Sequence, residues 1–196
     1  MKAKNSNITL TLEQEEMLVK KVKQQPAAFS LLYDQYYPLI FNYVYKRTLD
    51  FDLTKDICSE VFLKAFLKIN QFRWKGVSIA AWFYRIATNE INLSHRRKKY
   101  KPSSMNDLLG EVKLELPDPA SLQEEKDAIE RQMQEHEDFL LIQSKLKLLP
   151  LKYQEVIALR YFEQKSIQEI SQILEKKSGT IKSLISRGLE KIRQMI

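Results

Sequence analysis

Apolar residues recur at steps of three and four along most of the chain, and this periodicity constrains the fold most strongly. Steps of three and four place side chains on one face of an α-helix. Strand signals are weak, because the 196 residues include only four glycines and contain neither Asn-Gly nor Asp-Gly. The pattern therefore predicts an all-α protein.

Charged residues divide the chain into three parts. Residues 1–101 carry 18 basic and 9 acidic side chains, residues 102–138 carry 3 and 11, and residues 139–196 carry 11 and 5. The middle part contains Pro102, Pro117 and Pro119, which disfavour a continuous helix, and its acidic excess repels itself. We expect two helical domains, over 1–101 and 139–196, joined by an acidic linker over 102–138. The basic outer parts favour nucleic acid as a partner.

Several classes of protein are disfavoured by composition. A single cysteine, Cys58, excludes an internal disulfide framework, and two histidines offer little for a metal site. The longest uncharged run, residues 35–45, is short of the roughly 20 apolar residues that cross a bilayer. The N-terminus lacks the apolar segment of a secretory signal. We expect a cytoplasmic protein that is not an enzyme, with no cofactor, no metal, no small-molecule substrate and no insertion into membranes.

The first domain is predicted to be a helical bundle. Thr11 and Gln14 form a capping box for a helix over about residues 12–23. The next helix, from Phe29 onward, contains Pro38, which we expect to kink it or split it in two. Asp52 is the predicted N-cap of a third helix over about residues 53–69. The polar face of this third helix is equally consistent with a solvated surface and with a partner surface.

Residues 70–101 combine aromatic and basic side chains. A predicted loop contains Phe72, Arg73, Trp74 and Lys75, and the helix after it carries Tyr84, Arg85, Asn89, Arg96 and Arg97. Aromatic rings stack on unpaired bases while cations neutralise phosphate, so this composition suits single-stranded nucleic acid. Trp82 and Phe83 are better explained as core residues. Trp74 stands between two cations in the loop and is the better candidate for stacking.

The last part of the chain predicts a helix-turn-helix. Ser166 and Glu169 form a second capping box, a turn follows over residues 175–177, and Ser178 is the predicted cap of the final helix. The polar face of that helix carries Thr180, Lys182, Ser183, Ser186 and Arg187. Such a face meets base edges in the major groove. Protein-binding modules of three helices share the periodicity, so the pattern alone leaves both readings open.

Three segments, in this order and spacing, resemble the bacterial sigma factors of the extracytoplasmic-function (ECF) group. They are DICSEVFLKAF (56–66), AWFYRIATNEI (81–91) followed by RRKK (96–99), and LPLKYQEVIALRYFEQKSIQEISQIL (149–174) followed by SGTIKSLISRGLEKIR (178–193). The resemblance covers about residues 25–101 and 140–196. It implies a protein that binds core RNA polymerase and directs promoter recognition, promoter melting and transcription initiation. It also implies an anti-sigma factor as a partner, and a linker that threads through channels of the polymerase.

The resemblance assigns roles to individual residues. Polymerase binding falls on Asp56, Ser59, Glu60 and Leu63. Binding of the melted non-template strand of the minus-ten element is assigned to Phe72, Arg73, Trp74, Lys75, Tyr84, Arg85, Asn89, Arg96 and Arg97. The minus-thirty-five duplex falls on Thr180, Lys182, Ser183, Ser186 and Arg187. Three positions depart from the group: Ser59 replaces a usual glutamine, Phe83 a usual leucine and Leu184 a common arginine.

Other functions explain less of the chain. A helix-turn-helix regulator that does not replace a sigma factor leaves the aromatic loop and the 56–66 helix unexplained. A nuclease requires clustered carboxylates or histidines, which the basic parts lack. An interaction module for an acidic partner would use the basic faces without promoter DNA.

Overall fold

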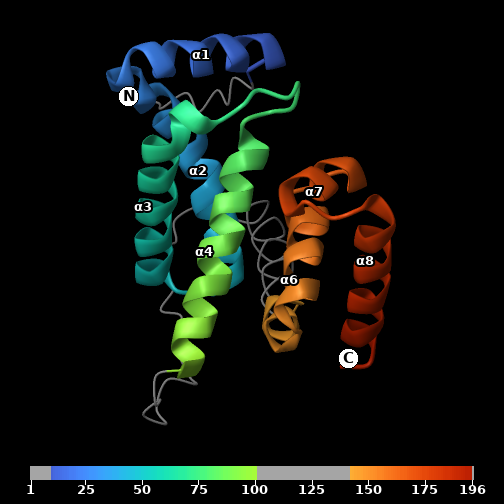
Figure 1. Cartoon of the computed structure of the whole chain (residues 1–196). Coiled ribbons are helices and arrows are strands. Elements are labelled where there is room, and N and C mark those ends of the chain that lie inside the picture. Colours follow the sequence, from blue (N-terminus) through green and yellow to red (C-terminus); the bar gives the residue numbers. More distant parts are fainter. Residues whose placement is uncertain (1–9, 101–141, 196) are drawn as a thin grey trace, which may run out of the picture.

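In the part of the chain that the structure describes, all regular secondary structure is helical and there is no strand (Figure 1). The computed structural model describes residues 10–100 and 142–195, so the predicted linker over 102–138 lies outside the described residues. The α-helices are α1 (Leu12–Gln24), α2 (Phe29–Thr48), α3 (Phe51–Lys68), α4 (Ala80–Tyr100), α6 (Leu151–Ile157), α7 (Ile167–Leu174) and α8 (Ser178–Arg193). Shorter helical segments are η1 (Pro26–Ala28), η2 (Ile69–Gln71), residues 142–148 and the π-helix η3 (Ala158–Phe162). The predicted all-α class is confirmed.

The predicted capping box fixes the start of α1. The Thr11 hydroxyl accepts a hydrogen bond from the Gln14 backbone N–H, and the Gln14 side chain accepts one from the Thr11 backbone N–H. Two donors at the helix start are thereby satisfied. From this start α1 lies across one end of the bundle of α2, α3 and α4 (Figure 1).

α2 continues through Pro38 as one helix, so of the two predicted outcomes the split is wrong. Proline removes one backbone donor and crowds the preceding turn, which costs helix stability. Leu32 and Tyr36 before it, and Ile40 and Tyr43 after it, are all buried in the same core. Burial of apolar side chains on both sides of the proline holds the helix together.

The predicted cap of α3 is also wrong, because Asp50 and not Asp52 occupies the N-cap. The backbone of Asp50 is extended, and its carboxylate accepts a hydrogen bond from the Leu53 N–H at 2.9 Å. Asp52 lies exposed in the first turn, where its charge favours the positive end of the helix dipole. Either aspartate suits a helix start, and the turn after α2 decides between them.

α6, η3, α7 and α8 form the predicted helix-turn-helix. The Ser166–Glu169 capping box starts α7, and Glu175, with a left-handed φ of 53°, ends it. The predicted cap of α8 is wrong, since Lys177 occupies the N-cap and Ser178 is the first helical residue. α8 lies close to α6 at Gly188, where a Cβ atom would lie 2.7 Å from an Ile157 methyl carbon.

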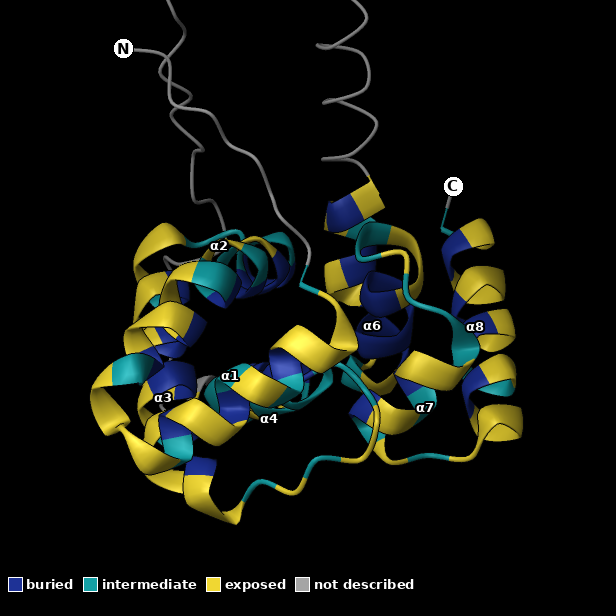
Figure 2. Ribbon diagram, turned by 90° about the horizontal axis from the view of Figure 1, so that it is seen from above, coloured by how far each residue is buried: buried dark blue, intermediate teal, exposed yellow. Residues whose placement is uncertain are grey.

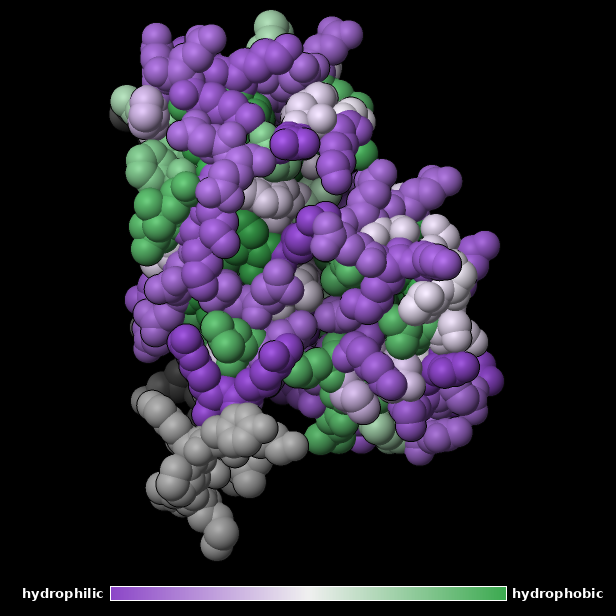
Figure 3. Space-filling model, in the orientation of Figure 1, coloured by the Kyte–Doolittle hydropathy of each residue, from purple (hydrophilic) through white to green (hydrophobic). Residues whose placement is uncertain are grey.

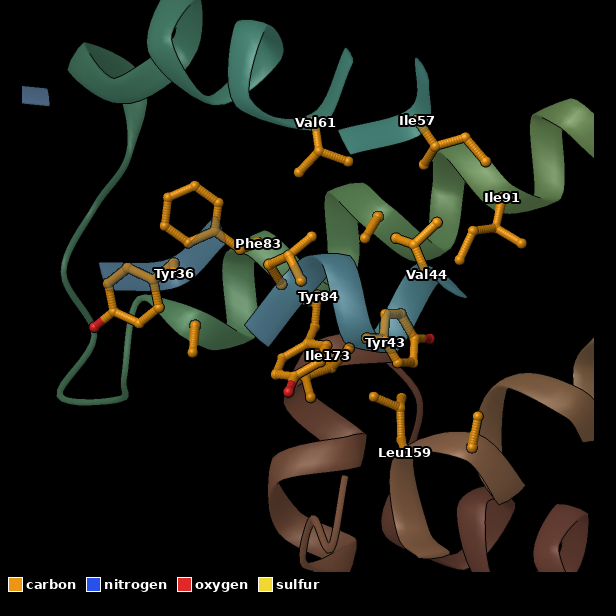
Figure 4. Packing of buried hydrophobic residues seen from close by; sticks show 14 of the residues in the cluster. Tyr36, Tyr43, Val44, Ile57, Val61, Phe83, Tyr84, Ile91, Leu159 and Ile173 are labelled. Carbon is orange, nitrogen blue, oxygen red and sulfur yellow. The ribbon is translucent and has the colours of Figure 1, made fainter. Parts of the chain in front are cut away.

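The N-terminal bundle (residues 10–100) and the C-terminal domain (residues 142–195) share one apolar core. α7 contacts α4, and η3 contacts α2. Tyr43 and Tyr84 of the bundle are directed toward Leu159 and Ile173 of the C-terminal domain (Figure 4). Seen from above, α6 and α7 lie next to the bundle and α8 lies on the far side of them (Figure 2).

Candidate nucleic-acid interface

The outer side of α8 presents the side chains predicted to contact duplex DNA. Thr180, Lys182, Ser186 and Arg187 are exposed and Ser183 is half-buried. Ile181 and Ile185 are buried on the opposite side of the helix. The helical period therefore separates a core face from a polar face. Short hydroxyls allow close approach to a groove, and the two cations can reach guanine edges or phosphates.

The Phe72–Ser78 loop, between η2 and α4, presents aromatic rings beside exposed cations. Arg73 and Lys75 are exposed, and Phe72 and Trp74 are half-buried. The Phe72 ring lies edge-on to Trp74 with centroids 6.4 Å apart, and 4.9 Å from the Trp82 ring. The loop therefore offers stacking surfaces and positive charge together, as an unpaired strand requires.

A cavity of about 600 Å³ opens between this loop and α7. Arg73, Lys75 and Trp82 line the bundle side, and Gln172 and Glu175 line the other side. Pockets for small molecules span about 300–1,000 Å³, so the cavity has room for an unstacked nucleotide. The cavity is lined by both the N-terminal bundle and the C-terminal domain, so its shape changes if these two parts separate.

Arg85 is the centre of the contact between α4 and α7. Its guanidinium donates to the backbone carbonyls of Ile173 at 3.1 Å and Gln172 at 2.7 Å. It also pairs with the Glu175 carboxylate at 2.5 Å. The two carbonyls belong to the last turn of α7, at the negative end of its dipole. A cation predicted to contact the minus-ten strand is thus held by the C-terminal domain.

Tyr84 is fully buried between the two parts rather than exposed on the surface. Its hydroxyl donates to one oxygen of Glu163 at 2.7 Å, and Lys46 of α2 pairs with the other oxygen at 3.1 Å. Burial, together with the charge and hydrogen bond of Glu163, raises the pKa of Tyr84 far above its usual range. The phenol therefore stays protonated and remains a donor to Glu163.

The remaining predicted minus-ten residues lie further along α4. Asn89, Arg96 and Arg97 are exposed. Asn89 lines a smaller hollow of about 140 Å³ together with Glu155 and Glu175 of the C-terminal domain. The structure thus brings Tyr84, Arg85 and Asn89 to one face of α4, and this face lies against the C-terminal domain.

α3 carries the residues predicted to bind polymerase, and all of them are exposed: Asp56, Ser59, Glu60 and Leu63. Phe66 and Leu67 extend the apolar part of this face, and the side chains of Leu63, Phe66 and Leu67 are 52%, 42% and 66% exposed. Apolar surface gathers over the end of α3 nearest α1, along the left edge of the molecule (Figure 3). Contiguous exposed apolar surface marks contact sites, which favours a partner surface over a solvated one.

Sequence reasoning missed the residues that hold these surfaces in place. Glu163 and Glu175 bind the minus-ten face from the C-terminal domain. Glu15 is buried and accepts three hydrogen bonds, one from Tyr36. Acidic side chains are exposed in most proteins, so the sequence carries no signal that these three are bound.

Within residues 10–100 and 142–195, no three His, Cys, Asp or Glu side chains gather as metal ligands would. None of the helices in the same ranges has both the length and the apolarity to span a membrane.

Two segments of the chain match family models. Residues 32–100 match Sigma-70 region 2, and residues 139–192 match Sigma-70, region 4. The ECF RNA polymerase sigma factor SigW of Bacillus subtilis (strain 168) is 31% identical over 186 residues, covering 93% of this chain and 98% of that protein. The ECF RNA polymerase sigma-E factor of Haemophilus influenzae is 28% identical over 183 residues, covering 93% and 95%.

Solved structures show a similar fold. CnrH, in complex with the cytosolic domain of CnrY, superposes with a TM-score of 0.63 at 15% identity, over 92% of this chain and 96% of that chain. The sigma factor RpoE of Bartonella quintana, in complex with the anti-sigma factor NepR, gives 0.59 at 19% identity, over 85% and 94%. At these identities the likeness concerns the fold.

The family matches fall on the two parts that carry the candidate faces. Region 2 covers α3, the Phe72–Ser78 loop and α4, and region 4 covers the helix-turn-helix. SigW is similar along almost its whole length. This chain therefore belongs to the ECF group of RNA polymerase sigma factors.

Proposed function

We propose that this sigma factor uses three separate surfaces: α3 for core RNA polymerase, the Phe72–Ser78 loop with α4 for the melted minus-ten strand, and α8 for the minus-thirty-five duplex. The exposed apolar and acidic face of α3 carries the proposal, because a DNA-binding regulator acting alone has no use for it. Core polymerase works in the cytoplasm, so the protein acts there.

On α3, polymerase binding combines two kinds of contact. Leu63, Phe66 and Leu67 offer apolar area, which contributes about 25 cal/mol for each Å² removed from water. Asp56 and Glu60 lie on the same exposed side of the helix and add charge that selects a basic partner surface. Acidic groups at the edge of an apolar contact set orientation more than affinity.

Promoter melting is biased by capture of bases that have left the stack. Unstacking costs on the order of a few kcal/mol. Stacking of a base on an aromatic side chain returns roughly 1–3 kcal/mol per base, and Trp74 and Phe72 supply such rings beside Arg73 and Lys75. Capture of this kind requires no covalent step by the sigma factor, which therefore acts without enzymatic activity.

Strand capture requires the C-terminal domain to move away from α4. Tyr84 is buried against Glu163, and Arg85 is held by three acceptors of α7 and the turn after it. α8 can meet duplex DNA in the closed arrangement, whereas Tyr84 and Arg85 of α4 cannot meet a strand. The two promoter elements lie apart on the DNA, so the two parts of the sigma factor must separate to reach both. Binding to polymerase is the step that opens the molecule.

An anti-sigma factor is a further proposed partner. CnrH and RpoE of Bartonella quintana share the fold and are each seen with a bound protein, which for RpoE is an anti-sigma factor. The exposed apolar face of α3 would suit such a partner as well as polymerase, and competition for it would keep the sigma factor inactive.

Co-elution with core RNA polymerase from the same host tests the proposal directly. We expect stoichiometric binding that Asp56→Arg abolishes and that Glu13→Arg, an exposed substitution on α1, leaves intact. Transcription from host DNA by the assembled enzyme, with mapping of transcript starts, then identifies promoters. Failure to bind polymerase, with tight sequence-specific binding of duplex DNA by the chain alone, would establish the ordinary regulator instead.

A further inference from the structure

α1 contacts the loop that is proposed to capture the minus-ten strand, although no role has been assigned to this helix. It lies across the end of the bundle where the Phe72–Ser78 loop leaves η2 and enters α4 (Figure 1). α1 also contacts η2, which immediately precedes the loop. Two side chains of α1, Glu15 and Lys23, form hydrogen bonds with the two ends of the loop.

Glu15 holds the C-terminal end of the loop. One carboxylate oxygen accepts hydrogen bonds from the Tyr36 hydroxyl at 2.7 Å and the Ser78 hydroxyl at 2.8 Å. The other accepts the Ile79 backbone N–H at 2.9 Å. Glu15 is only 5% exposed, and a buried carboxylate is stable only when such donors satisfy it.

These contacts fix the start of α4 as well as the loop. Ile79 immediately precedes α4, where backbone donors lack partners within the helix and negative charge is favoured. The Ser78 hydroxyl, besides donating to Glu15, accepts the Ala80 N–H at 3.2 Å. Burial, and then the hydrogen bond to Glu15, raise the pKa of Tyr36 far above its usual range, so that Tyr36 remains a donor.

Lys23 holds the other end of the loop. Its ammonium group donates to the Phe72 backbone carbonyl at 2.5 Å. Lys23 follows Glu15 by eight residues, which is about 12 Å along a helix that rises 1.5 Å per residue. A single rigid helix therefore holds the first and the last residue of the loop, and leaves Arg73 and Lys75 exposed between them.

We propose that Glu15 and Lys23 are positioning residues for strand capture, which hold the Phe72–Ser78 loop in its base-binding shape before DNA arrives. This inference rests on the proposed function of the loop. A loop that must be ordered on binding costs affinity, and a loop held in advance does not. Neither side chain needs to touch the strand for this effect.

A purely structural role for Glu15, holding α1 on the bundle, would weaken all activities together. The test therefore separates strand binding from duplex binding. Polymerase carrying each variant is titrated with a labelled promoter fork, single-stranded over the minus-ten segment, from a promoter mapped with the unmodified protein. The isolated upstream duplex is titrated against each free variant, and polymerase binding is measured by co-elution.

We expect Glu15→Ala and Lys23→Ala each to weaken fork binding by about tenfold or more, with duplex and polymerase binding within about twofold of the unmodified protein. Glu15→Gln keeps an acceptor for Tyr36 and Ser78 and should fall between. Glu16→Ala and Lys20→Ala remove an ion pair on the same helix between a half-buried glutamate and an exposed lysine, so they are the matched controls and should change nothing. Unchanged fork binding in both main variants, or equal loss of fork, duplex and polymerase binding, overturns the proposal.

Fluorescence of Trp74 gives a second measurement that needs neither polymerase nor promoter. In a Trp82→Phe background Trp74 is the one remaining tryptophan, since the chain has two. Acrylamide should quench Trp74 more strongly in Lys23→Ala and Glu15→Ala than in Lys20→Ala. Equal quenching of Trp74 in the folded variants overturns the proposal. If the unmodified chain directs no transcription, the proposed function is contradicted, and the quenching measurement still decides whether Glu15 and Lys23 hold the loop.

Discussion

The two candidate DNA-binding faces, on α8 and on α4, differ in whether the folded chain leaves them accessible. The α8 face is open, with four of its five predicted residues exposed and Ser183 half-buried. The α4 face is closed, because Tyr84 and Arg85 are held by acceptors of the C-terminal domain. The closed face is the one proposed to bind DNA that exists only after melting, and the open one is proposed to bind ordinary duplex.

The acceptors on the C-terminal domain resemble those of a DNA strand. The Glu163 carboxylate binds Tyr84 and Lys46. The Glu175 carboxylate and the carbonyls at the end of α7 bind Arg85. These groups present negative charge and hydrogen-bond acceptors. A phosphate backbone presents the same chemistry. The free sigma factor can therefore keep its strand-binding face occupied until polymerase moves the two parts apart.

Removing the acidic acceptors should produce the largest change. In Glu163→Ala/Glu175→Ala, the closed state leaves Tyr84, Lys46 and Arg85 without their carboxylates, while the open state hydrates all three. Tyr84 is the buried group left unpaired, whereas Lys46 keeps the Phe162 carbonyl and Arg85 keeps two carbonyls of α7. A buried group left unpaired costs about 1–3 kcal/mol, which shifts the equilibrium toward the open state by roughly 5- to 150-fold. Fluorescence anisotropy with a labelled single-stranded minus-ten oligonucleotide should show tighter binding to the free chain.

Glu190→Ala is the matched control, since Glu190 lies exposed on α8 and contacts the neighbouring Gln194 and Arg193. It should leave strand binding as it was. Equal affinity of the double variant and the unmodified chain would show that the contact between the two parts does not limit access to the α4 face.

Arg187→Ala should affect the open face alone. Loss of an arginine that contacts a base edge costs about 1–3 kcal/mol and relaxes specificity at that position. Titration with the upstream duplex should show this loss, with polymerase binding and strand binding unchanged. A parallel loss of strand binding would contradict the separation of the two faces.

The sequence predicted the open face better than the closed one. Thr180, Lys182, Ser186 and Arg187 belong to an amphipathic helix, and the helical period alone gives their exposure. The sequence assigned Tyr84 to the strand-binding residues without indicating its burial, which depends on Glu163, 79 positions further along the chain. Contacts between distant segments leave no periodic signal, and for the same reason Glu15 was missed. The cap of α3 is misplaced because both Asp50 and Asp52 suit the position. The cap of α8 is misplaced because its N-cap, Lys177, forms no side-chain capping hydrogen bond, so the sequence carries no signal for it.

Trp74→Ala tests the stacking surface beside the closed α4 face. Removing a ring on which a base stacks costs about 1–3 kcal/mol per base. Fork binding by the assembled polymerase should weaken accordingly, with upstream duplex binding kept. The loss is expected only after the C-terminal domain has moved away from α4. In the free chain, Trp74→Ala should therefore weaken strand binding more in the Glu163→Ala/Glu175→Ala background than in the unmodified chain. Equal effects in both backgrounds would show that the loop is accessible in the closed state.

Lys182→Ala should give the smallest change and sharpen the description of the open face. Lys182 is exposed on α8 and can reach phosphate without reading sequence. Removal of one phosphate contact lowers the slope of log affinity against log salt concentration by about one and weakens all duplexes alike. Titrations of a promoter duplex and a scrambled duplex across salt concentrations measure both quantities. A selective loss for the promoter duplex would instead show that Lys182 contacts a base, which would place two sequence-reading cations on this face and extend the contact toward the N-terminal end of α8.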